Sequence, residues 1–252
     1  MARQARLSLA GQLHHVLLRG NGRECVFADD ADRRTFIDQL VRHAATHGVA
    51  LHAWALMPDH VHLLATPARD DALSLCVQAV GRGYVQAFNR RHGRRGSLWE
   101  GRYRSTVLEP DPWLLRAMVW LDTHPQRQPA GSLAMPHSGL ALGDGAGDQQ
   151  TGGHPWITAG HYLGVAAIPG LTVPPQYWAL GNTPFAREAA YRTMLVQGCA
   201  EAHRVALAEA ALKGWALGSE AFVASLQQGT GRRLAKGRPG RPVSLLTSSD
   251  KR

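Results

Sequence analysis

Two spacings of apolar residues divide the first half of the chain into short elements. Stretches bounded by Gly, Pro or Asp predict four strands, at residues 12–19, 49–56, from 60 onward and 98–108. Apolar positions three and four residues apart predict three helices, which begin near residues 29, 71 and 111 and end near residues 47, 91 and 124. The first half is therefore predicted to mix helices and strands in regular succession.

The predicted order of these seven elements is β-α-β-β-α-β-α. This order is close to the split βαβ arrangement of ferredoxin-like domains, an α+β fold with an antiparallel sheet. Helices in such a domain cover one face of the sheet. We expect the other face to stay open for a ligand.

The composition changes after residue 128, which predicts three further parts. Residues 129–154 are rich in Gly, Pro, Ser and Asp and predict a linker, whereas residues 155–228 return to helical spacing and predict a mostly helical C-terminal region. Residues 229–252 hold many cations and a Gly-Arg-Pro run, which predicts a basic flexible tail. Such a tail can lie along DNA as an extended arm, with Arg238 and Arg241 as its contacts. The predicted units are thus 1–128, 129–154, 155–228 and 229–252.

The charge balance favours a polyanionic partner. There are 28 Lys and Arg against 19 Asp and Glu, a net charge of +9. The three cysteines have no disulfide or zinc-site spacing, which is typical of a reducing compartment. No apolar run is long enough to cross a membrane, so we expect a soluble, cytoplasmic protein with no membrane partner.

Basic residues cluster around the predicted fourth strand. Seven arginines and one acid lie between Gly81 and Thr106, with aromatic residues interleaved among them. Arginines that bind phosphate beside rings that stack on bases are typical of proteins that bind single-stranded nucleic acid. The residues that we expect to contact nucleic acid here are Arg90, Arg91, Arg94, Arg95, Trp99, Arg102, Tyr103 and Arg104.

A His-x-His pair marks the predicted third strand. Side chains alternate along a strand, so His60 and His62 point to one face while Val61 points to the other. Neutral imidazole is a good ligand for divalent metals, and a rigid strand fixes both rings before the ion arrives. The pair therefore predicts half of a metal site.

Several ordered motifs carry a family resemblance. They are the HHV stretch at 14–16 with RGN at 19–21, LMPDHVHLL at 56–64, FNRRHG at 88–93 with LWEGRYRS at 98–105, and GWALGSEAF at 214–222. In these motifs the sequence resembles the REP-associated tyrosine transposases, which belong to the single-tyrosine HUH transposases. The resemblance covers most of residues 5–128 and, more loosely, the helical region after about residue 155.

This resemblance implies a transposition function for a mobile element. It implies a ferredoxin-like endonuclease domain that acts on single-stranded hairpin DNA from REP-like repeats, with Mg²⁺ or Mn²⁺ held by the HUH histidines His60 and His62. In the family a tyrosine attacks phosphorus and forms a covalent link to DNA. Here Trp120 stands in the position of that tyrosine, and His124 stands in the position of an Asn that provides a third metal ligand.

Tryptophan has no oxygen that can attack phosphorus, which leaves three explanations open. The protein has lost strand transfer and remains a hairpin-binding protein in which Trp120 stacks on a base. Alternatively, another tyrosine replaces the missing one, and Tyr103 is the nearest candidate. Alternatively, metal-activated water cleaves the DNA without a covalent intermediate.

The sequence therefore predicts a transposase-family protein that binds single-stranded hairpin DNA at a divalent-metal HUH site. DNA cleavage is compatible with this prediction, whereas covalent strand transfer conflicts with the missing tyrosine. The alternatives are an RNA-binding module that uses the same sheet, a metal-dependent hydrolytic nuclease and a hydrolase of a small phosphorylated substrate.

Overall fold

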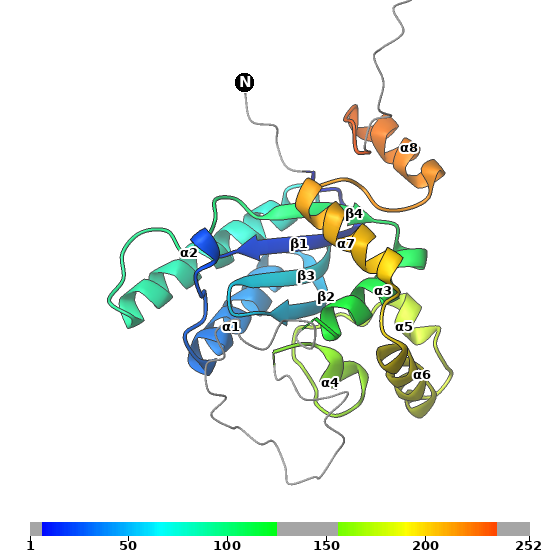
Figure 1. Cartoon of the computed structure of the whole chain (residues 1–252), viewed down its shortest axis with the longest axis horizontal. Helices are drawn as coiled ribbons and strands as arrows, with labels where there is room; N and C mark the ends of the chain where they lie inside the picture. The colour runs from blue at the N-terminus through cyan, green and yellow to red at the C-terminus, as the bar shows by residue number, and fades with distance from the viewer. Residues whose placement is uncertain (1–6, 125–155, 236–252) are drawn as a thin grey trace, which may run out of the picture.

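A computed structural model describes residues 7–124 and 156–235 (Figure 1). The first segment contains β1 (Leu13–Arg19), the 3-10 turn η1 (Asn21–Arg23), α1 (Asp30–His47), β2 (Val49–Leu56), β3 (His60–Pro67), α2 (Ala72–Arg91), β4 (Arg104–Leu108) and α3 (Pro110–Asp122). The second contains α4 (Ala159–Tyr162), α5 (Pro175–Trp178), α6 (Pro184–Gln197), α7 (Glu201–Lys213) and α8 (Glu220–Thr230). The predicted helical character of the second segment is confirmed.

The four strands form one antiparallel sheet in the order β2-β3-β1-β4. With the helices between the strands, this order is that of the split βαβ fold, so the predicted fold class is confirmed. The fourth strand is shorter than predicted, because it begins only at Arg104. Residues before it form a loop in which Gly101 has a left-handed φ of 66°, a conformation that ends an extended strand.

Local sequence signals define the ends of α1. The Asp29 side chain accepts hydrogen bonds from the backbone N–H groups of Ala31 and Asp32, and Gly48 ends the helix in the left-handed conformation. The next strand, β2, starts directly after that glycine. The predicted bounds of both elements agree with the structure.

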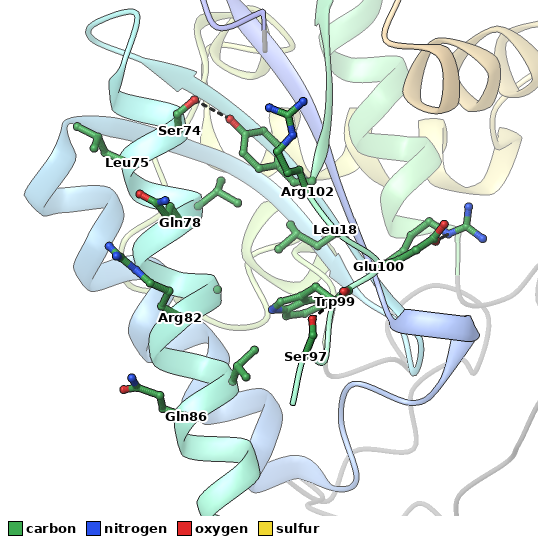
Figure 2. Close-up of a pocket in the computed structure, with 16 residues that line it drawn as sticks. Leu18, Ser74, Leu75, Gln78, Arg82, Gln86, Ser97, Trp99, Glu100 and Arg102 are labelled. Carbon is green, nitrogen blue, oxygen red and sulfur yellow. Dashed lines mark hydrogen bonds and ion pairs between the residues drawn. The ribbon is translucent and has the colours of Figure 1, made fainter. Parts of the chain in front are cut away.

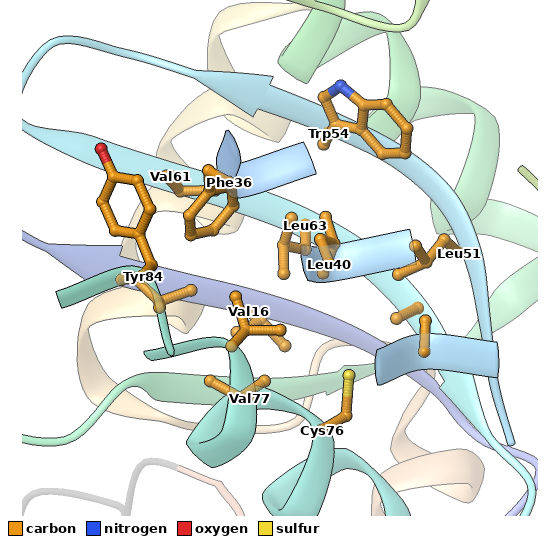
Figure 3. Packing of buried hydrophobic residues seen from close by; sticks show 14 of the residues in the cluster. Val16, Phe36, Leu40, Leu51, Trp54, Val61, Leu63, Cys76, Val77 and Tyr84 are labelled. Atoms are coloured by element: carbon orange, nitrogen blue, oxygen red, sulfur yellow. The ribbon is translucent and has the colours of Figure 1, made fainter. Parts of the chain in front are cut away.

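One face of the sheet packs on α1 and α2 through apolar side chains (Figure 3). Val16 of β1, Val61 and Leu63 of β3 and Phe36 of α1 are members of this core. The three strand residues point inward because strand side chains alternate and the apolar set falls on this side.

The other face of the sheet is also covered, which corrects the expectation of an open face. Leu13, Ala55 and Leu64 lie on it and pack against α3 and the helical C-terminal region. These side chains are apolar and require cover, because exposed apolar surface on both sides of a sheet is unfavourable. The part of this face near the start of β3 carries histidines in place of apolar side chains.

Chain from the second described segment hydrogen-bonds to both edge strands. The Leu217 N–H donates to the carbonyl of Val107 in β4, and the Leu56 N–H of β2 donates to the carbonyl of Trp156. Buried side chains add a third link, because the Tyr191 hydroxyl of α6 donates to Asp122 of α3 at 2.7 Å. The helical region is therefore bonded directly to the sheet domain.

Some sequence predictions fall outside the described residues. These are the linker at 129–154 and the part of the basic tail that contains Arg238 and Arg241. The boundaries between the predicted units stay predictions. Among the helices of the described residues, none combines the length and the apolarity that a membrane crossing needs.

Candidate metal and nucleic-acid site

Three histidines from two elements converge on the second face of the sheet. His60 and His62 come from β3, and His124 follows the end of α3. Each offers one ring nitrogen, and the three nitrogens lie within 4.8 Å of one another. Val61, between the two strand histidines, is buried in the core on the opposite face. Strand alternation therefore separates the site from the core.

The geometry of the donors fits a divalent metal ion. The Nε2 atoms of His60 and His124 are 3.0 Å apart. Two ligands at right angles around an ion, each at a metal–nitrogen distance of about 2.1 Å, are about 3 Å apart. The triad can therefore hold a divalent metal with only small movements of the rings.

Each strand histidine has a hydrogen-bond partner at Nδ1. The Nδ1 of His60 lies 2.6 Å from a carboxylate oxygen of Asp59, and the Nδ1 of His62 lies 2.8 Å from Nε2 of His15. The bond from His60 is the main cause that lowers the pKa of Asp59, so Asp59 is the acceptor. Such partners fix a histidine ring and leave Nε2 for the metal. The structure thus provides supporting contacts as well as ligands.

His15 is buried and neutral. Its exposed fraction is 1%, and burial lowers its pKa to about 3. A His62 that binds metal through Nε2 carries its proton on Nδ1, from which it can donate a hydrogen bond to Nε2 of His15. Sequence reasoning did not assign this role to His15, although strand alternation places it on the same face as Leu13 and Leu17.

Trp120 lies inside the histidine cluster. Its ring packs edge-on against His15, His62 and His124, with ring centres 5.3, 4.9 and 5.2 Å apart. Only 5% of the residue is exposed. Base stacking by Trp120 stays a prediction, and it requires the ring to leave this packed position.

No tyrosine hydroxyl of the chain is placed at the histidines. The chain has five tyrosines, and all lie within the described residues. The hydroxyl of Tyr84 bonds to the Val26 carbonyl, Tyr103 to Ser74, Tyr162 to the His52 carbonyl, Tyr177 to the Tyr162 carbonyl and Tyr191 to Asp122. Tyr103 packs with the α1–α2 core, on the opposite face of the sheet from His62. The structure therefore gives no support to Tyr103 as a substitute nucleophile.

The predicted phosphate-binding arginines fall into two groups. Arg91 pairs with Asp29 and Asp32, and Arg94 pairs with Glu24, so these two charges already have partners within the protein. The others, which are exposed, are Arg90, Arg95, Arg102 and Arg104. Arg104 also donates to the Leu212 carbonyl at the end of α7.

Strand register places two arginines beside the triad. Arg104 pairs with Leu17, which pairs with His62 on its other side. Arg19 pairs directly with His60. Residues paired across neighbouring strands share a face, so Arg19 lies next to His60, and Arg104 lies on the same face two strands from His62. Sequence reasoning missed Arg19, although it shares the alternation of His15 along β1.

We compared the chain with models of known protein families. Residues 9–113 match the family model described as "Transposase IS200 like". This part of the chain is similar to the IS200-like transposases. The matched residues include His60 and His62 and end before Trp120 and His124, and the match agrees with the family resemblance expected from the motifs.

Two solved structures resemble this chain. One is described as the REP-associated tyrosine transposase bound to a REP hairpin, with a TM-score of 0.49, 13% identity and coverage of 70% of this chain and 93% of the other. The second, a transposase structure from Deinococcus radiodurans, has a TM-score of 0.34, 25% identity and coverage of 49% and 97%. No curated protein matches the chain.

Proposed function

We propose that this protein binds single-stranded hairpin DNA of the REP type at a divalent-metal site formed by His60, His62 and His124. The convergence of these three imidazoles within 4.8 Å is the observation that carries the proposal. When bound, the metal would stabilise negative charge that develops on a phosphate oxygen.

The ligand set favours a transition metal over magnesium. Mg²⁺ prefers oxygen ligands, whereas imidazole suits softer divalent ions. No carboxylate belongs to the triad, since Asp59 is occupied by Nδ1 of His60. Of the two ions that the resemblance implies, Mn²⁺ should bind more tightly than Mg²⁺.

Arginines beside the triad are suited to hold the DNA backbone. Arg19 and Arg104 would bind phosphates on either side of the one that faces the histidines, and Arg90, Arg95 and Arg102 would add contacts at a greater distance. Arginine forms paired hydrogen bonds with phosphate oxygens. The net charge of +9 supports a polyanionic partner in general.

The position of every tyrosine argues against covalent strand transfer. The nearest candidate in sequence to α3 is Tyr103, and its hydroxyl bonds to Ser74 on α2. Burial and the neighbouring Asp122 raise the pKa of Tyr191 well above its usual value, which makes its hydroxyl a poor nucleophile. We therefore propose that DNA binding takes place without a phosphotyrosine intermediate.

Hydrolytic cleavage is the second candidate function. Two of the three histidines keep supporting contacts, His60 with Asp59 and His62 with His15, which is the arrangement typical of metal ligands. With Trp120 in place of tyrosine, water is the remaining nucleophile. In that case His60, His62 and His124 would hold the metal ion beside the phosphate, and water would add to phosphorus and release a product with free ends.

The test is binding and cleavage of labelled DNA hairpins with unpaired flanks, with Mn²⁺ or with chelator. The variants are His60→Ala/His62→Ala, Trp120→Tyr and, as a matched loss of two imidazoles from the surface of α1, His43→Ala/His47→Ala. We expect metal to strengthen binding by the wild type and the α1 control but not by the His60/His62 variant. A covalent protein–DNA adduct should form, if at all, only with Trp120→Tyr.

Four results would contradict the proposal. One is an adduct with the wild type, and another is a response to metal that survives the loss of His60 and His62. The third is tighter binding to an RNA hairpin of the same sequence, which favours the RNA alternative. Weak dependence on salt would indicate a small phosphorylated substrate instead, since binding to a nucleic acid backbone falls steeply with salt.

A further inference from the structure

The end of α3 carries polar side chains on two different sides. The helix lies between the sheet and α6 (Figure 1). Trp120 and His124 are four residues apart, and their rings both pack against His62, with ring centres 4.9 and 5.0 Å away. Asp122 stands between them in sequence and is turned about 200° around the helix axis. Its carboxyl group therefore points to a different side from the histidines.

Asp122 is held by residues of the second described segment. One carboxylate oxygen accepts hydrogen bonds from the backbone N–H and the hydroxyl of Thr158, each at 3.2 Å, and the other accepts from the hydroxyl of Tyr191 at 2.7 Å. Asp122 is 3% exposed and Tyr191 is 0% exposed. A buried carboxyl group needs such donors, because they replace its hydrogen bonds to water. These contacts fix the end of α3 to chain that lies 36 and 69 residues further on.

The position of His124 depends on the end of α3. Its backbone N–H donates to the Leu121 carbonyl at 3.0 Å, so its backbone follows the last turn of the helix. His60 and His62, in contrast, are fixed by the pairing of β3 with β1. Distances between a metal and its ligands vary by only about 0.2 Å. A shift of the end of α3 would therefore move one ring of the triad away from the metal and leave the other two in place.

We propose that Asp122 and Tyr191 are positioning residues that hold His124 at the metal. The inference rests on the proposed function, because it concerns the third ligand of the same site. Removal of the Tyr191 hydroxyl would leave a buried carboxylate oxygen without its donor, which favours a shift of the end of α3. The helical C-terminal region thus contributes to metal binding through α3.

The test is calorimetric titration of the full chain with Mn²⁺. Tyr191→Phe keeps the buried ring and removes only the hydroxyl. We expect it to weaken Mn²⁺ binding about tenfold, at the lower end of the range for contacts that support metal ligands. His124→Ala should weaken binding further, because it removes the ligand itself. Tyr191→Phe should have no additional effect in a His124→Ala chain, since a residue that acts through His124 has nothing to position there.

Pulsed electron paramagnetic resonance gives a second measurement. With Cu²⁺ at less than one equivalent as the probe, couplings to the remote ring nitrogens count the imidazoles bound to the metal. The wild type should show three imidazoles, and the fraction of metal with three should fall in Tyr191→Phe. His124→Ala provides the reference spectrum with two. A change that affected only the stability of the fold would not alter this count.

A conservative variant separates the contacts of Asp122 from its charge. The amide of Asp122→Asn can accept from Thr158 and can donate to the Tyr191 hydroxyl, which is able to act as an acceptor. Asp122→Asn should therefore keep the Mn²⁺ affinity and the Cu²⁺ spectrum of the wild type. Asp122→Ala removes all these contacts and should weaken Mn²⁺ binding at least as much as Tyr191→Phe.

Two further variants are matched controls. Tyr177→Phe removes a buried hydroxyl of the same helical region, which bonds to the Tyr162 carbonyl. Tyr103→Phe removes a hydroxyl that bonds to Ser74 of α2, on the other side of the sheet (Figure 2). Both should bind Mn²⁺ like the wild type. Urea unfolding of these controls and of Tyr191→Phe shows whether metal affinity simply follows stability.

The outcomes separate this inference from the proposed function. If Tyr191→Phe binds Mn²⁺ like the wild type, or weakens binding equally with and without His124, the inference is wrong and the proposed metal site stands. Equal losses of affinity in Tyr191→Phe and Tyr177→Phe would also overturn it, because general loosening of the helical region would then be the cause. If His124→Ala leaves Mn²⁺ affinity unchanged, the three-histidine site of the proposed function itself fails.

Discussion

The two faces of the sheet use the same strands for different purposes. On the α1–α2 face, Val16, Val61 and Leu63 belong to an apolar core (Figure 3). On the other face, apolar packing gives way near the start of β3 to His15, His60 and His62, with Trp120 among them. Neighbouring residues of one strand therefore serve stability on one side and ligand chemistry on the other.

This difference shows what a buried polar cluster requires. A core of hydrocarbon side chains needs only shape and volume, whereas buried imidazoles need partners in a fixed geometry. Asp59 and His15 supply these partners for His60 and His62. Substitutions on the first face should therefore alter the stability of the fold, and substitutions on the second face should alter metal binding.

The largest effect is expected on the apolar face. Phe36 is fully buried and contacts the rings of Phe27 and Tyr84, so Phe36→Ala should lower the free energy of unfolding by about 3–5 kcal/mol. Urea denaturation measures this change. The Mn²⁺ affinity of the molecules that remain folded should not change, and a parallel fall in affinity would contradict the separation of the two faces.

Acid should destabilise the fold through His14, which lies on the same side of β1 as Val16. Its Nδ1 donates to the Gln12 carbonyl, its Nε2 accepts from the Leu9 N–H, and burial lowers its pKa from 6.5 to about 4. As the pH falls below 6.5, His14 takes up a proton in the unfolded chain. In the folded protein it takes up this proton only near pH 4. His14 should therefore remove about 3 kcal/mol of stability between these values.

Urea unfolding at several pH values between 7 and 4 measures this loss. Gln at position 14 can donate and accept hydrogen bonds but does not titrate in this range. His14→Gln should therefore make the decline of stability with falling pH less steep. If the slope of unfolding free energy against pH is the same in His14→Gln as in the wild type, protonation of His14 is not a cause of the loss of stability.

The supporting contact on the polar face should have a smaller effect. His15→Phe keeps a ring against Trp120 but removes the acceptor for Nδ1 of His62. Loss of such a contact typically weakens metal binding about 10–100-fold. Calorimetric titration with Mn²⁺ measures it, with His14→Gln as the matched loss of a neighbouring imidazole. Equal affinities in the wild type and His15→Phe would mean that His15 serves packing alone.

The smallest effect is expected at Tyr103. Tyr103→Phe removes one hydrogen bond to Ser74, which should cost about 1 kcal/mol of unfolding free energy. Metal binding and any DNA cleavage should stay unchanged, because this hydroxyl lies across the sheet from the histidines. Loss of cleavage with Tyr103→Phe would restore this residue as a nucleophile.

Local signals made much of the fold predictable. Gly48 marked the end of α1, and alternation along β3 was enough to place His60 and His62 on one face. The cover over the second face was missed, although a signal existed. Leu13 and Leu17 of β1 are apolar at the positions that face that side, which indicates a strand buried on both faces.

Contacts between distant residues were not predictable in the same way. Arg91 was assigned to phosphate, but its partners Asp29 and Asp32 lie about 60 residues earlier in the chain. The bond between His15 and His62 spans 47 residues. Charge and residue type do not show which residues of two distant elements lie opposite each other. His124, the third histidine of the triad, was therefore predicted only from the family resemblance.

The contacts of the second described segment also determine which shorter fragments of the chain should stay free of aggregation. Edge strands present unpaired N–H and C=O groups that recruit strands from other molecules. Here Trp156 and Thr172 bond to β2, and Leu217 bonds to both sides of the end of β4, so both edges are already occupied within one chain. A fragment that ends at residue 128 would expose both edges together with the apolar second face. We expect it to aggregate, so a fragment intended to stay monomeric should extend beyond residue 217.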